Sequence, residues 1–106
     1  MAIAEVSVVP LGTKTTSVSQ YVARAVKVLE QEKDIEYEIT PMGTVIEGDL
    51  DRILAVVKKM HEGVFGEEVA RVLTTVKIDD RRDKARGMKE KVDSLKKKLE
   101  GQLNYP

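Results

Sequence analysis

One carboxylate of this chain has an unusual setting, because Glu47 follows two apolar residues and precedes Gly48 in the segment TVIEG. If the segment is a central strand, water reaches the carboxylate only from the flank, and an ionised group there needs a specific partner. Gly48 leaves room beside the carboxylate for another stretch of backbone or for the ring of a ligand. The residue types leave two interpretations open. Glu47 accepts a cationic or amino-bearing ligand, or it forms an ion pair, within the sheet or between subunits, with Arg71 or Lys77.

Other polar groups in the chain fit structural roles better than chemical ones. His61 has no second histidine or cysteine with which to form a closed zinc site, and the alternating charges of residues 79–83 favour pairing among themselves. The hydroxyl-rich loop at 13–17 can hold an anion through free backbone N–H groups, but capping of the following helix is the simpler interpretation. No nucleophile, base and orienting group stand at a catalytic spacing, and no glycine-rich phosphate loop is present. We therefore expect no catalytic residues, no metal site and no enzymatic activity.

The segments that must position these residues alternate between the periods of strands and helices. In chain order we predict a strand at 2–9, a helix opened by a capping box of Ser17 and Gln20, strands at 35–40 and 44–47 joined by a tight turn, a helix capped by Asp49, a strand at 69–79, and a last helix with the apolar residues Met88, Val92, Leu95 and Leu99. Two strand-helix-strand halves joined by a hairpin predict an α+β fold, the ferredoxin-like βαββαβ sandwich with an additional C-terminal helix. The first and third strands are then central in the sheet.

The two faces of this sheet should differ. The first two helices should cover one face, where the buried residues are Ala4, Val6, Val8, Ile35, Tyr37, Ile39, Ile46 and the even-numbered residues of the last strand. The opposite, open face carries Glu47, Ser7 and Thr40, whereas strict alternation puts Thr44 on the helix side, away from Glu47. The open face, the unprotected last strand at the sheet edge and the apolar stripe of the last helix together indicate self-association.

Composition and charge limit the classes of function. With 106 residues the chain is long enough for one core, so we expect a single domain over residues 1–106. The 18 basic and 18 acidic side chains give a formal net charge of +0, which argues against nucleic acid as a partner. No apolar run approaches the length that spans a membrane, and the first residues lack the pattern of a signal peptide. We expect a cytoplasmic protein without nucleic-acid or membrane partners.

Three motifs in the same order, SVSQYVARAV, PMGTVIEG and RVLTTVKIDDRRDK, resemble the thiamine-binding protein family over nearly the whole chain. The resemblance implies a ferredoxin-like fold and assembly of the chain with itself into homodimers and dimer-of-dimers homotetramers. It also implies binding of a small molecule, thiamine or its hydroxymethylpyrimidine part, in place of catalysis. Apart from that ligand, thiamine or a related pyrimidine, no cofactor is implied.

Thiamine combines a cationic thiazolium with an aminopyrimidine, whose ring nitrogen and amino group can face a carboxylate and hydroxyls. The resemblance implies a ligand-binding set in which Glu47 takes the heterocycle while Ser7, Thr40, Thr44 and Ser17 supply neutral hydrogen bonds. A carrier or sensor of thiamine-like compounds is the preferred function. The alternatives are a structural or regulatory homo-oligomer without a thiamine ligand, and an enzyme of thiamine-related metabolism.

Overall fold

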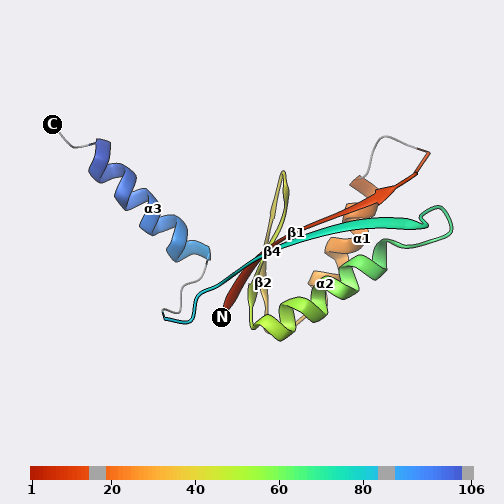
Figure 1. Ribbon diagram of the computed structural model, residues 1–106, viewed down its shortest axis with the longest axis horizontal. Coiled ribbons are helices and arrows are strands. Elements are labelled where there is room, and N and C mark those ends of the chain that lie inside the picture. Colours follow the sequence, from red (N-terminus) through yellow and green to blue (C-terminus); the bar gives the residue numbers. More distant parts are fainter. Residues whose placement is uncertain (15–18, 84–87, 104–106) are drawn as a thin grey trace.

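The computed structural model describes residues 1–14, 19–83 and 88–103. Its elements are β1 (Ala2–Leu11), α1 (Ser19–Glu30), β2 (Glu36–Thr40), β3 (Gly43–Gly48), α2 (Leu50–Val64), β4 (Arg71–Asp80) and α3 (Met88–Leu103). The strands form one antiparallel sheet in the order β2-β3-β1-β4, so that β1 and β3 are central and β4 lies at an edge (Figure 1). The predicted βαββαβ sandwich with an additional C-terminal helix is confirmed.

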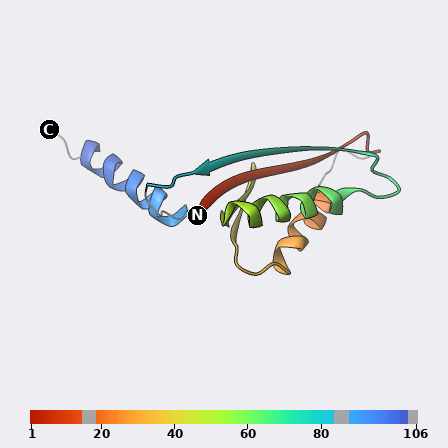
Figure 2. The ribbon, with the colours of Figure 1, turned by 60° about the horizontal axis from the view of Figure 1, so that its bottom comes forward.

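The core lies between one face of the sheet and the two helices α1 and α2 (Figure 2). Even-numbered side chains of β1, from Ala2 to Val8, and Ile46 of β3 are buried on this side. The apolar residues of α2 recur at intervals of three or four positions, which places them on one side of the helix. That side packs against the sheet and buries Ile53, Val56, Val57, Met60 and Val64.

The outer strand β2 is less covered than the alternation predicts. Tyr37 and Ile39 lie opposite Ile46 and Thr44 of β3, on the helix side of the sheet, in agreement with the period of two. Their side chains are nevertheless 36% and 60% exposed. The prediction that they are buried is wrong, because α1 and α2 pack over the central strands and leave the β2 edge open. Ile78, near the end of the other edge strand, is exposed as well.

β1 runs beyond its predicted end at residue 9 and passes through Pro10 to Leu11. β3 accompanies β1 only as far as Val6, so the second half of β1 has β4 as its neighbour on one side and no strand on the other. Pro10 pairs with Val72 of β4, and a proline is tolerated in a strand at such an edge. The sheet therefore narrows beside the β2–β3 turn.

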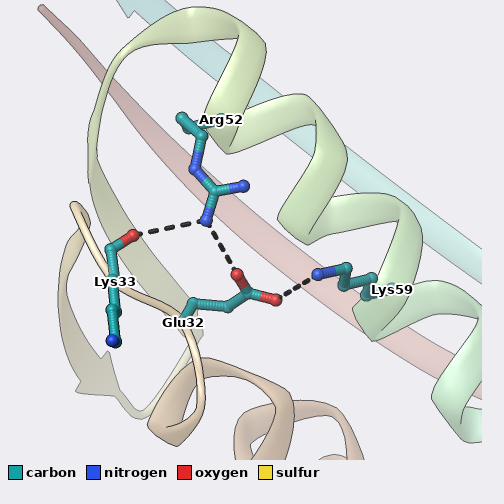
Figure 3. A network of polar contacts seen from close by, with 4 residues as sticks. All are labelled: Glu32, Lys33, Arg52 and Lys59. Atoms are coloured by element: carbon teal, nitrogen blue, oxygen red, sulfur yellow. Dashed lines mark hydrogen bonds and ion pairs between the residues drawn. The ribbon is translucent and has the colours of Figure 1, made fainter.

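An ion-pair network fastens the connection between α1 and β2 to α2 (Figure 3). The carboxylate of Glu32 accepts hydrogen bonds from Arg52 at 2.8 Å and from Lys59 at 2.6 Å, and its side chain is 10% exposed. Arg52 also donates to the backbone oxygen of Lys33 at 3.3 Å. The hydrogen bond from Lys59, followed by that from Arg52, lowers the pKa of Glu32 below its ordinary value. The network therefore holds a negative charge at Glu32 between two cations of α2.

α3 stands apart from the sandwich in both ribbon views (Figures 1 and 2). Its apolar stripe is open to solvent, with Val92, Leu95 and Leu99 exposed by 50%, 57% and 48%. An ion pair between Lys91 and Asp79 joins its first turn to the end of β4. The expectation that this helix has no place in the sandwich is confirmed, while self-association stays a prediction. In the described part of the chain, no helix combines the length and the apolarity needed to span a bilayer.

Candidate ligand-binding site

A cavity of about 200 Å³ lies beside the β2–β3 turn, where the second half of β1 has no neighbour from β3. We call it the hairpin pocket, and its lining residues are Val6, Ser7, Val8, Val9, Val22, Ala25, Val26, Ile39, Thr40, Pro41, Met42, Gly43, Thr44 and Met60. A Cβ at Gly43 would lie 2.7 Å from the backbone oxygen of Val6, so this end of β3 approaches β1 too closely for a side chain. The pocket forms because β3 starts at Gly43 whereas β1 continues to Leu11.

The hairpin pocket is lined by three of the residues predicted to bind a ligand, Ser7 and Thr40 from the open face and Thr44. Thr44 lies on the helix side of the sheet, as strict alternation predicts, and is 4% exposed. The hydroxyl of Thr40 is partly used by the turn, since it donates to the backbone oxygen of Gly43 at 2.9 Å and accepts from the backbone N–H two residues on at 3.3 Å. It retains one lone pair for a ligand. Ser17 lies outside the described residues.

Glu47 lies at the opposite end of β3 and on the open face of the sheet. It faces Ile3 of β1 and Glu36 of β2. A separate cavity of about 370 Å³ is lined by Met1, Asp34, Ile35, Glu36, Glu47 and Gly48, and we call it the Glu47 cavity. Thr44 is about 10 Å away along the strand and lies on the other face. One ring in contact with the Thr44 hydroxyl therefore cannot also reach Glu47.

The space beside Gly48 is filled by the chain itself. A Cβ at this position would lie 3.1 Å from Cγ2 of Ile35 and 3.3 Å from the backbone oxygen of Asp34. Of the two sequence interpretations of this glycine, close approach of another stretch of backbone is correct. On the side where a Cβ would point, a ligand ring has no room at Gly48, although it can still approach the Glu47 carboxylate from the open face.

The register of β4 bears on the alternative that Glu47 forms an ion pair. In the row of Glu47, across Ile3, the residue on β4 is Asp79. Arg71 begins β4, about 26 Å from Asp79 along the strand, so it is out of reach of Glu47 within one chain. Lys77 lies two strands away from Glu47 and is displaced from its row. A pair between Glu47 and a cation of another subunit stays a prediction.

The remaining polar groups singled out in the sequence have structural contacts. Nδ1 of His61, on α2, is 2.6 Å from Oγ1 of Thr74 on β4, and its ring packs edge-on against Phe65 with 5.3 Å between centroids. The charges of residues 79–83 pair among themselves as predicted, through Arg81–Asp83 at 2.6 Å and Arg82–Asp80 at 3.0 Å. Within residues 1–14, 19–83 and 88–103, no group of three or more His, Cys, Asp or Glu side chains is placed to hold a metal ion.

The apolar part of the hairpin pocket is the feature that sequence reasoning misses. In the sequence Val22 belongs to the apolar stripe of a helix and Met42 to a turn, which conceals that they line one cavity. A signal is nevertheless present in the sequence, because the strand predicted at 2–9 is longer than its neighbour predicted at 44–47, and the structure keeps this difference with 10 residues in β1 and 6 in β3. A long strand beside a short one leaves apolar residues without a neighbouring strand, and a cavity can form there.

Three comparisons place the chain among known proteins. A family model described as thiamine-binding protein matches residues 4–96. A UPF0045 protein of Methanothermobacter thermautotrophicus is 50% identical over 100 residues, which cover 93% of this chain and 100% of that protein. The UPF0045 protein YqgV of Bacillus subtilis is 47% identical over 103 residues, covering 94% of this chain and 99% of that protein. The crystal structure of the hypothetical protein MJ1052 of Methanocaldococcus jannaschii superposes with a TM-score of 0.81 at 42% identity, covering 89% of this chain and 94% of that one.

Proposed function

The chain belongs to the thiamine-binding protein family, and we propose that it binds thiamine, or the hydroxymethylpyrimidine part of thiamine, as a carrier or sensor. The observation that carries the proposal is the hairpin pocket, which is lined by Ser7, Thr40 and Thr44 together with apolar residues. A few polar groups in an otherwise apolar cavity are typical of small-molecule sites. Binding without catalysis is in keeping with membership of a family described by what it binds.

The lining of the hairpin pocket suits a small flat heterocycle. Val22, Ile39 and Met42 offer apolar surface to the faces of a ring, while the hydroxyl of Thr44, on the helix side, can donate or accept at its edge. None of the described lining residues is charged, so burying a permanently cationic ring there would cost desolvation energy. The neutral aminopyrimidine is therefore the part of thiamine that we place in the pocket, with the thiazolium toward solvent.

The Glu47 cavity is the competing position. It is bordered by the carboxylates of Asp34 and Glu36 as well as Glu47, and such a setting favours a cation. Because one ring cannot contact Thr44 and Glu47 together, the two cavities are alternative sites for the heterocycle within one chain. Glu47 as the main acceptor, the role derived from the sequence, is therefore tested separately from the hairpin pocket.

Calorimetric titration with thiamine and with hydroxymethylpyrimidine tests the function and locates the site. Val22→Phe adds bulk to the lining of the hairpin pocket and should abolish binding, whereas Leu54→Phe adds bulk at an exposed position of α2 outside the lining and should not. Thr44→Val keeps the shape and removes one hydrogen bond worth about 0.5–1.5 kcal/mol, so the affinity should fall about two- to tenfold. Melting curves of each variant establish that the fold is retained.

Glu47→Gln distinguishes the two cavities. With the ligand in the hairpin pocket, its affinity should be unchanged. A loss of about ten- to a hundredfold, the effect of removing a charge-assisted hydrogen bond, together with intact binding by Val22→Phe, would move the site to the Glu47 cavity. If the same change lowers stability or assembly while thiamine affinity holds, Glu47 is an ion-pair partner.

Two experimental results would contradict the proposal that the protein binds thiamine or its hydroxymethylpyrimidine part. If neither compound gives a calorimetric signal or a shift in melting temperature, the proposal is wrong and a structural or regulatory homo-oligomer is favoured. Turnover of thiamine or of its precursors by the purified protein would instead favour an enzyme of thiamine-related metabolism.

A further inference from the structure

The apolar stripe of α3 is bordered by lysines on both sides. With about 3.6 residues per turn, Lys89 and Lys96 follow the stripe on one side, Lys91 and Lys98 follow it on the other, and Lys97 lies on the opposite side of the helix. Two copies of α3 packed stripe to stripe would set lysine against lysine, whether the helices run parallel or antiparallel. The surface that covers the stripe should therefore be apolar with acidic borders.

The open face of the sheet offers such a surface around Val45. In one row across the sheet, Val45 of β3 lies between Glu38 of β2 and Glu5 of β1. Both glutamates are exposed, and Val45 is half-buried. Neighbouring strands are about 4.8 Å apart, so the two acidic residues border the valine at a separation of about 10 Å. A helix with its side chains is about 10–12 Å wide, which matches this separation.

The rows on either side of Val45 extend the same pattern. Toward the β2–β3 turn, Gly43 faces Thr40, and these small residues leave room for an apposed helix. In the other direction, Glu36 faces Glu47 and continues the acidic border along β2. Lys77 of β4 pairs with Glu5 of β1. The acidic surface therefore ends at β1, and basic and acidic residues mix on β4.

We propose that α3 of a second copy of this chain lies along β3 on the open face, with its apolar stripe over Val45 and its bordering lysines beside Glu5 and Glu38. The chain's own α3 extends away from its sheet in Figures 1 and 2, so the occupant comes from another molecule. In a two-fold pair each chain donates one helix and receives one. The formal net charge of +0 is then distributed between an acidic face and a basic helix that fit each other. This interface leaves Thr44 and the helix-side part of the hairpin pocket uncovered, whereas on the open face it borders Thr40, Gly43 and Glu47.

A charge-swap experiment tests this pairing. The first variant carries Lys89→Glu, Lys96→Glu and Lys98→Glu, and the second carries Glu5→Lys, Glu36→Lys and Glu38→Lys. Either variant alone sets like charges against each other, so light scattering should show a mass of half the wild-type value or less. An equimolar mixture restores opposite charges at both contacts of the pair and should recover the wild-type mass.

Lys97→Glu is the control, because it changes a charge on the outer side of α3 and should leave the mass unchanged. Far-UV circular dichroism establishes that each variant is folded. The proposal is overturned by a wild-type protein that is monomeric at micromolar concentration, by either variant keeping the wild-type mass, or by folded variants that fail to reassemble when mixed. A monomeric wild type that sediments with vesicles of phosphatidylserine would also overturn it, and would assign the basic face of α3 to a lipid surface.

Discussion

α2 and α3 carry apolar stripes of the same kind, yet the two helices lie in opposite environments. On α2 the residues Ile53 and Met60 are buried against the sheet, whereas Leu95 on α3 is mostly exposed. The helices differ in their tethers, because α2 connects β3 to β4 of one sheet and α3 follows β4 alone. A helix held at both ends by strands of one sheet packs back on that sheet. Apolar periodicity thus predicts that a face is covered, and connectivity determines whether the same chain covers it.

The largest expected difference in stability is between substitutions in the apolar stripe of α2 and in that of α3. Ile53→Ala removes a fully buried side chain and should lower the free energy of unfolding by about 2–5 kcal/mol. Leu95→Ala should change the stability of an isolated chain by less than about 0.5 kcal/mol, as is usual for exposed positions. Urea unfolding of both variants beside the wild type measures the difference.

Protein concentration provides the control for this pair of variants. If a second copy covers the α3 stripe, the loss in Leu95→Ala should grow with protein concentration, because association stabilises the folded state by mass action. The loss in Ile53→Ala should show no such growth. Equal losses for both variants in a monomeric protein would mean that α3 packs on its own sandwich and that the comparison fails.

A smaller loss of stability is expected from a change on β4, which α2 contacts through His61. Thr74→Val keeps the shape of the side chain and removes the hydroxyl at 2.6 Å from Nδ1 of His61, which should cost about 0.5–1.5 kcal/mol. Thr75→Val is the matched change on the open face and should stay within about 0.5 kcal/mol of the wild type. Chemical denaturation of the two variants decides the matter, and equal losses would show that the His61 contact does not help to fasten α2.

The smallest effect concerns pH and the carboxylate that bridges to α2. Lys59 and Arg52 lower the pKa of Glu32 below its ordinary value of 4.5. A carboxyl with a lowered pKa in the folded state adds stability above its unfolded pKa and loses it as the pH falls through the folded pKa. The difference in Tm between wild type and Glu32→Gln should therefore be full at neutral pH and shrink below about pH 4.5.

Thermal melts between neutral and acidic pH measure this dependence. Lys59→Met removes the first cause of the lowered pKa, so in that background Glu32→Gln should have less effect on Tm. A difference in Tm that stays constant down to the lowest pH at which the chain folds would contradict the assignment of the network to α2 docking.

The order of elements could be predicted because the apolar period changes clearly along the chain, and the strand order followed from the known topology of two strand-helix-strand halves. Burial of Tyr37 and Ile39 could not be predicted, since their alternation reports only which face they share. How far α1 and α2 extend across the sheet depends on packing between distant segments. Pro10 suggested that the first strand ends there. The strand continues because β3 does not pair with this part of β1, and the sequence does not show that absence of pairing.

The candidate site was predictable in part for the same reasons. Counting residues places Thr44 on the face opposite Glu47, and the structure agrees. Gly48 allowed either a backbone or a ligand as its neighbour, and only the path of the chain at Asp34 and Ile35 decides between them. The hairpin pocket depends on the mismatch in strand length together with the position of α1. The first of these is visible in sequence, but the second is not.

Pro10 also limits how far a sheet of this kind can grow. Open backbone edges lie along β2, along the second half of β1 and along β4. Proline in the β1 stretch discourages strand addition, and β2 offers 5 residues, whereas β4 offers 10 residues without proline. Among the described residues, β4 is thus the edge that favours addition. When two molecules pair through β4, neither has another edge that favours strand addition. The combined sheet therefore ends at two molecules and does not extend into a fibre.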